Sequence, residues 1–137
     1  MDPHEPTKYE LLPDSMAASD LETLFNELLL SNTPDPLVTT NALYELATRQ
    51  WHTYEPLAPS VAQRIDDWLV TNWDTNSLAF TDTATAIVAH LRLPRTLQII
   101  RSLVGHPDPE IDRVIRGLIA ELDVGDPLDP WWDLRNL

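Results

Sequence analysis

The sequence has no cysteine, only three glycines and a single lysine, Lys8, in 137 residues. The absence of cysteine excludes disulfides, a thiol nucleophile and thiolate metal ligands, and we expect a reducing, cytoplasmic location. Gly105, Gly117 and Gly125 lie too far apart to form either common glycine-rich phosphate-binding loop. The familiar nucleotide-binding loops and cysteine-dependent chemistries are therefore excluded.

Long apolar runs and alternating strand patterns are also missing. A membrane-spanning helix needs about 18–20 consecutive apolar residues, so we expect no membrane association. The opening segment MDPHEPTKYELLPD is acidic and proline-rich without an apolar core, and we therefore expect no secretory signal. What the chain does have is proline, twelve in all, placed mostly between segments with helical periodicity.

The tripeptide Pro-Asp-Pro occurs twice, in NTPDPLVTTNA and in GHPDPEIDRVI. Asp35 and Asp108 are suited to cap the helix that follows, because a carboxylate accepts hydrogen bonds from free N–H groups of the first turn. Pro36 and Pro109 fit the first helical position, where no N–H donor is needed. Each copy therefore predicts the start of a helix.

Amphipathic helices are predicted on both sides of each turn, in LETLFNELLL and in RTLQIIRSLV before it. The two turns are about 73 residues apart, close to twice a two-helix repeat of about 37 residues. A middle unit is expected over 58–92, with Asp82 as the cap of its second helix. The sequence thus predicts an all-α fold of three antiparallel helical hairpins, stacked as a short solenoid or bundle.

The predicted organisation is a single domain with two irregular ends. Residues 1–14 are expected to form a flexible N-terminal arm and 15–123 the single α-helical repeat domain. The tail 124–137, which contains Trp131 and Trp132, is expected to pack on the last hairpin, because the end of a solenoid exposes apolar surface. Alternatively these two tryptophans anchor a partner, since tryptophan is enriched at binding hot spots.

Charge is the strongest compositional signal, with 22 acids against 9 lysines and arginines and a net charge of −13. Such a field repels phosphate backbones, so no nucleic-acid partner is expected. It attracts a protein with a basic surface and accelerates the association. Acidity also serves solubility, and the sequence leaves that alternative open.

The residues that could carry chemistry are better explained as structural. His106, Asp108, Glu110 and Asp112 in HPDPEID are expected to cap a helix and to favour its dipole, and not to bind a metal. The adjacent pair Asp66–Asp67 faces different sides of a helix, which makes a poor acid–base pair. No catalytic residue, cofactor site or metal site is predicted. His90 is expected to be a partly buried packing residue. Core packing is expected for three tryptophans, Trp51, Trp68 and Trp73.

The segment LVGHPDPEIDRVIRGLIAEL resembles a HEAT-type repeat, an amphipathic helix followed by a short Asp/Pro turn and a second helix. Residues 95–123 carry the resemblance best, 21–50 less well, and 58–92 only by pattern. The resemblance implies a binding scaffold whose second helices line a concave face, here near 36–50, 82–92 and 109–122. In size and charge the chain is also similar to bacterial immunity proteins, which neutralise a toxin domain.

These observations predict a non-enzymatic, protein-binding module, most simply an immunity-type inhibitor that occludes a basic toxin or enzyme. The alternative is a HEAT-like adaptor in a cytoplasmic complex. An enzyme that uses His90 or His106 is a third interpretation, which the sequence favours less. No cofactor is expected, and the oligomeric state stays open. The predicted protein-binding residues are Glu45, Asp82, Asp112, Arg116, Trp131 and Trp132.

Overall fold

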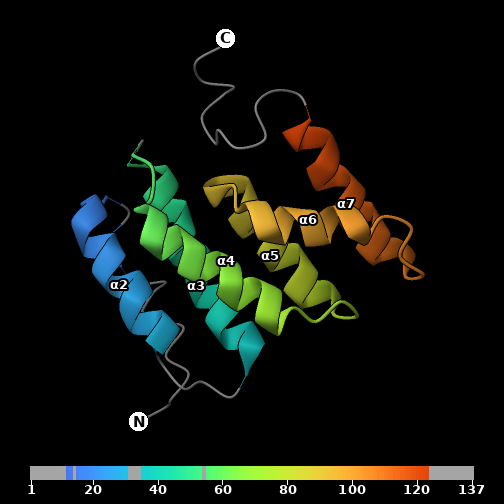
Figure 1. Cartoon of the computed structure of the whole chain (residues 1–137), viewed down its shortest axis with the longest axis horizontal. Coiled ribbons are helices and arrows are strands. Elements are labelled where there is room, and N and C mark those ends of the chain that lie inside the picture. The colour runs from blue at the N-terminus through green and yellow to red at the C-terminus, as the bar shows by residue number, and fades with distance from the viewer. Residues whose placement is uncertain (1–11, 14, 31–34, 54, 124–137) are drawn as a thin grey trace.

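The described part of the chain is entirely helical and contains no strand, as expected from the sequence. In the computed structural model, described residues are 12–13, 15–30, 35–53 and 55–123. Within them the helices are α2 (Ala18–Leu30), α3 (Pro36–Trp51), α4 (Pro59–Asn72), α5 (Leu78–Leu91), α6 (Pro94–Ser102) and α7 (Pro109–Leu122) (Figure 1).

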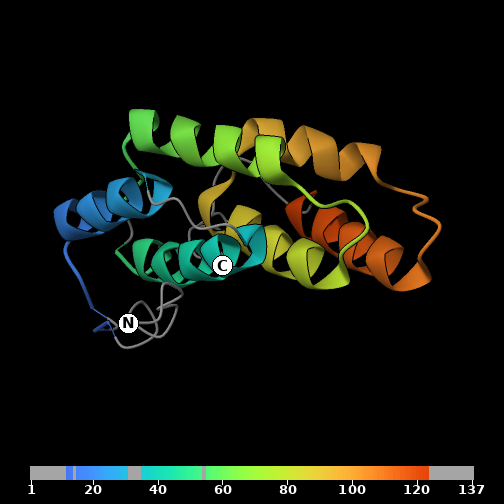
Figure 2. The ribbon, with the colours of Figure 1, turned by 90° about the horizontal axis from the view of Figure 1, so that it is seen from below.

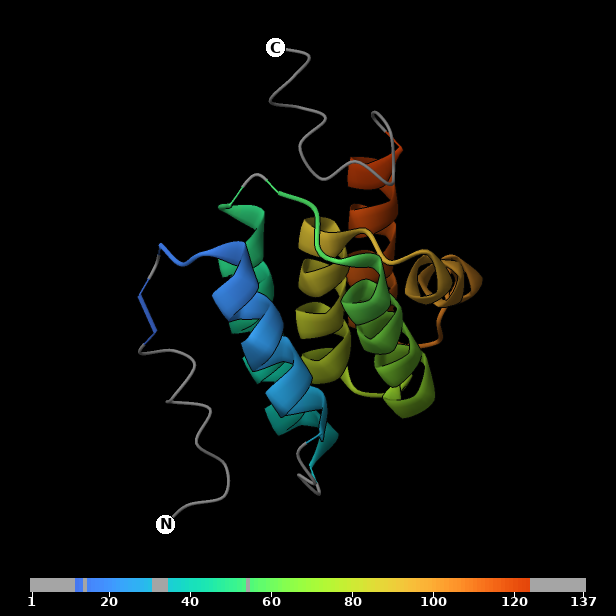
Figure 3. The same cartoon turned by 60° about the vertical axis from the view of Figure 1, so that its left-hand side comes forward.

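The helices form two layers, which Figure 2 shows edge-on. One layer consists of α3, α5 and α7, in which α5 packs against both neighbours. In the other layer α4 lies between α2 and α6 and packs against both. Contacts of α2 with α3 and of α6 with α7 join the layers, and Figure 3 shows α2 in front of α3 and running along it. This arrangement confirms the predicted series of helical hairpins.

The core consists of two clusters that meet at α5. The larger cluster fills the space among α2, α3, α4 and α5, with Phe25, Leu43, Leu46, Ile65 and Ile87 fully buried. The smaller cluster joins α5 to α6 and α7. Full burial of a Leu, Ile or Phe side chain stabilises a fold by roughly 1.5–3 kcal/mol, so these stripes hold the layers together.

Trp73, Trp68 and Trp51 are all partly buried, and the predicted packing against the core is confirmed for Trp73 and Trp68. Trp73 follows α4 and contacts both clusters, with its ring 5.5 Å from that of Phe80. Trp68 packs against the larger cluster, and Trp51 lies against His90 with ring centroids 5.8 Å apart.

Both Pro-Asp-Pro turns start helices in the predicted way. The Asp35 carboxylate accepts a hydrogen bond from the Leu37 N–H at 3.0 Å, and Asp108 accepts one from Glu110 at 2.9 Å. A proline occupies the first turn of α3 and of α7. The rest of HPDPEID is also structural, because the Asp108 N–H donates to His106 Nδ1 and Glu110 pairs with Arg113.

The prediction that Asp82 caps the second helix of the middle unit is wrong. The cap is Ser77, whose Oγ accepts from the Phe80 N–H at 3.1 Å, and α5 begins at Leu78. Asp82 therefore lies inside the helix. The earlier start places Phe80 in the core at 2 % exposure, and this burial stabilises the longer helix.

The cap of α6 comes from another helix. Leu93 precedes α6 and provides no side-chain hydrogen bond. Instead, buried Asp66 of α4 accepts from the N–H groups of Arg95 at 2.9 Å and Thr96 at 2.7 Å, and from the Thr96 hydroxyl at 2.5 Å. Asp67 pairs with the Arg95 guanidinium. The adjacent acids thus join the second hairpin to the third.

The predicted arm and tail fall largely outside the described residues. Leu12 and Pro13, at the end of the arm, contact α3 through their carbonyl groups. The prediction for the tail, including Trp131 and Trp132, lies outside the described residues altogether.

Candidate functional site

Buried polar side chains gather at the C-terminal end of α3. The apolar stripe of this helix, Leu43, Leu46 and Ala47, faces the larger cluster. Arg49 and Gln50 follow in the last turn and are buried at 5 % and 2 % exposure. Buried polar groups are costly unless they are hydrogen-bonded, so their partners show what this end of the helix holds in place.

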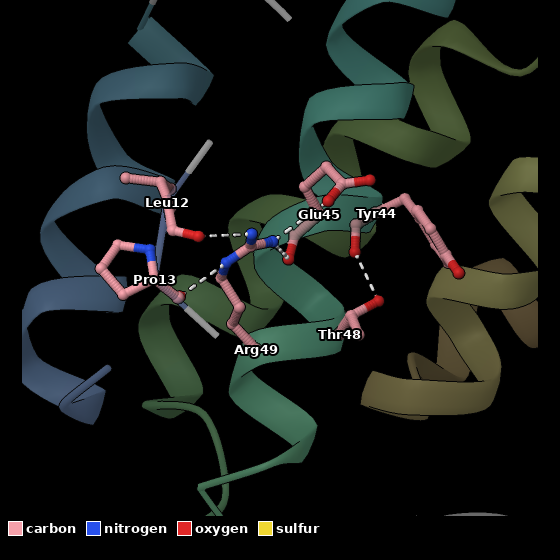
Figure 4. A network of polar contacts seen from close by, with 6 residues as sticks. All are labelled: Leu12, Pro13, Tyr44, Glu45, Thr48 and Arg49. Atoms are coloured by element: carbon pink, nitrogen blue, oxygen red, sulfur yellow. Dashed lines mark hydrogen bonds and ion pairs between the residues drawn. The ribbon is translucent and has the colours of Figure 1, made fainter. Parts of the chain in front are cut away.

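Arg49 connects α3 to the segment that precedes α2 (Figure 4). Its Nε donates to the Pro13 carbonyl at 3.0 Å and its Nη2 to the Leu12 carbonyl at 2.9 Å. Its Nη1 donates to the Glu45 carbonyl at 2.9 Å and pairs with the Glu45 carboxylate at 3.1 Å. The buried cation is therefore both neutralised and hydrogen-bonded, as burial of a charge requires.

Gln50 holds the segment that follows α3. Its Nε2 donates to the Glu55 carbonyl at 2.8 Å. The Thr53 hydroxyl donates to the Gln50 carbonyl at 2.7 Å and accepts from the Glu55 N–H at 3.1 Å. These bonds fix the backbone of residues 53 and 55 against the end of the helix.

A cavity of about 730 Å³ lies between these two segments. Residues 15–18 line one side, and Arg49, His52, Thr53 and Glu55 line the other. Its volume is in the range of small-molecule sites, about 300–1,000 Å³, and its lining is mixed polar and apolar.

An aromatic and imidazole cluster adjoins the cavity through His52. The ring centroids of Trp51 and His52 are 5.3 Å apart, those of Trp51 and His90 5.8 Å, and those of Tyr44 and His90 6.2 Å. Figure 4 shows Tyr44 and Arg49 on different sides of α3. Burial lowers the pKa of His90 from its ordinary 6.5, and the nearby His52 and Arg92 add to the effect. A neutral imidazole is therefore favoured, which suits the packing role predicted for His90.

The predicted protein-binding residues are not gathered at one place. Glu45 is committed to Arg49. Asp112 and Arg116 pair with each other on α7 at 2.8 Å. Hydrogen bonds from Arg116 and from the Gly105 N–H lower the pKa of Asp112. Asp82 is exposed on α5, and no interaction of its side chain with other described residues is found. Trp131 and Trp132 lie outside the described residues.

In the described part of the chain, arginine side chains are bonded within the chain, whereas many carboxylates are not. The side chain of every arginine there donates a hydrogen bond within the chain. Five of these arginines form ion pairs with carboxylates. By contrast, several carboxylates form no hydrogen bond or ion pair with described residues. These are Asp20, Glu22, Glu27, Glu55, Asp82 and Glu121.

Sequence reasoning did not identify Arg49, Gln50 or Asp66 as important. One signal was available for Arg49 and Gln50, because both follow the apolar stripe of α3 closely enough to share its buried side. No comparable signal exists for Asp66, whose partners lie 29 and 30 residues away.

Comparison with protein-family models, curated proteins and solved structures gives no match for the chain. The HEAT-like resemblance and the immunity-type interpretation therefore stay predictions. Among the described residues, no helix is long and apolar enough to cross a membrane, and no group of three or more His, Asp or Glu side chains could hold a metal ion.

Proposed function

We propose that this chain is a non-enzymatic, protein-binding module for a partner with a basic surface. In the leading version it is an immunity-type inhibitor that works in the cytoplasm and occludes a basic toxin or enzyme. The observation that carries the proposal is the unequal use of charge. Arginines of the described chain are engaged internally, whereas carboxylates on α2, on α5, on α7 and after α3 are available to a partner.

The mechanism is electrostatic steering followed by close packing. An excess of negative charge raises the rate at which a basic protein approaches, and the effect weakens as salt screens the field. Glu22, which is partly exposed, and Glu27, which is exposed, lie on α2, which forms an edge of the two-layer structure (Figure 1). This edge is thus favoured as the side that the partner meets first.

A HEAT-like adaptor is the second candidate function. It is supported by the layer of α3, α5 and α7, in which three second helices lie side by side. An inhibitor and an adaptor differ in outcome, because the inhibitor abolishes the activity of its partner at a one-to-one ratio and the adaptor leaves that activity in place.

The test is to capture the partner from the source cell and measure association rates at ionic strengths of about 0.1 M and 1 M, where the Debye length is about 10 Å and 3 Å. The on-rate should fall steeply with salt, and the double variant Glu22→Gln/Glu27→Gln should reduce it at low salt. As a matched control, Glu110→Gln/Arg113→Gln removes two charges of opposite sign, so it should leave the on-rate unchanged. A salt-insensitive on-rate, or a partner without a basic surface, would refute the proposal.

A further inference from the structure

We propose that the cavity at the C-terminal end of α3 binds a cationic side chain, arginine or lysine, of the protein partner. This inference rests on the proposed function and assigns it a specific pocket. It starts from the cavity of about 730 Å³ bounded by residues 15–18 and by Arg49, His52, Thr53 and Glu55.

The cavity is built before any partner arrives. Arg49 holds the chain just before one wall through the Leu12 and Pro13 carbonyls. The neighbouring Gln50 holds the other wall through the Glu55 carbonyl. Two adjacent, buried side chains thus fix both sides, and a site that needs no ordering on binding retains more of its interaction energy as affinity.

The ionisable residues of the lining are Glu55, Arg49 and His52, and the His52 ring packs against Trp51. The Glu55 carboxylate is the group that favours a cation. Glu55 is exposed and its side chain forms no hydrogen bond or ion pair with described residues, so its carboxylate is available. The Arg49 charge is offset by the Glu45 carboxylate at 3.1 Å and by three backbone carbonyls. In addition, the C-terminal end of α3 carries the partial negative charge of the helix dipole.

An anion is the competing occupant, since the first turn of α2 is also near the cavity and offers partial positive charge. Two observations disfavour it. Asp20 lies in that first turn and offsets the positive end, and the Arg49 guanidinium already donates to Leu12, Pro13 and Glu45. An anion would also approach against the net charge of −13.

The test uses the full chain, labelled with ¹⁵N, and Nα-acetyl-arginine methylamide as the probe. Saturable shifts are expected at the amides of Thr53 and Glu55. Glu55→Gln should weaken binding about threefold or more, as expected for a partly exposed ion pair. The matched control Glu121→Gln removes a carboxylate of α7 that has no ion pair among the described residues, and it should leave the affinity unchanged.

Three results with the unsubstituted chain would overturn the proposal: no shift at Thr53 and Glu55, an equal response to the uncharged norleucine analogue, or stronger shifts with inorganic phosphate. Equal weakening by Glu55→Gln and Glu121→Gln would also overturn it, because the effect would then be one of net charge. The amide spectrum of each variant shows directly whether it is folded. The association rate with the captured partner is a separate measurement, so failure of the pocket is distinguishable from failure of the proposed function.

Discussion

Replacement of Asp66 by alanine should be among the most damaging single changes to a polar residue of this protein. The buried carboxylate accepts from two backbone N–H groups at the start of α6 and from the Thr96 hydroxyl. Alanine offers no acceptor, so the Thr96 N–H, which lies in a fully buried residue, loses its partner.

The magnitude follows from the groups left behind. Loss of a helix cap costs about 0.5–2 kcal/mol, and a buried, unsatisfied donor costs about 1–3 kcal/mol. The two costs overlap, because the same carboxylate caps the helix and satisfies the buried donor. We therefore expect a loss of about 2–4 kcal/mol in the free energy of unfolding. For a domain with roughly 5–15 kcal/mol in total, this is a large fraction.

Urea unfolding, followed by tryptophan fluorescence and circular dichroism, measures the loss. With an m-value of about 1–3 kcal/mol/M, a loss of this size lowers the urea midpoint by roughly 0.7–4 M. The matched control is the neighbouring Asp67→Ala, which removes only the exposed ion pair with Arg95 and should cost at most about 1 kcal/mol. Equal effects of the two variants would refute the reasoning.

Two further predictions concern the caps and the imidazole cluster. Asp35→Ala and Asp108→Ala should each lower the free energy of unfolding by about 1 kcal/mol and should add in the double variant, because the caps serve different helices; no loss from either would contradict the turn geometry. Because burial, aided by His52 and Arg92, lowers the pKa of His90, the unfolded chain binds a proton more readily than the folded chain. Stability should therefore fall as the pH drops below the ordinary histidine pKa of 6.5. In His90→Phe, the urea midpoint should depend less steeply on pH than in the unsubstituted protein. An unchanged pH dependence would show that other groups cause the loss of stability.

The sequence by itself determined the helices and most of their starting points. Helical periodicity and Pro-Asp-Pro caps act over a few residues, as in the bonds from Leu37 to Asp35 and from Glu110 to Asp108, so they can be read without a partner segment. Local preference failed where two capping residues competed. Ser77 and Asp82 can both cap a helix, and the burial of Phe80 favoured the earlier start.

Tertiary structure alone decided which polar residues matter. Asp66 reaches Thr96 across 30 residues, and Arg49 reaches Leu12 and Pro13 across 37 and 36. The meeting of His90 with rings from α3 likewise depends on the packing of α3 against α5. Spacing along the chain carries no information on such contacts, because they form only when packing of the apolar stripes fixes how the helices lie against one another.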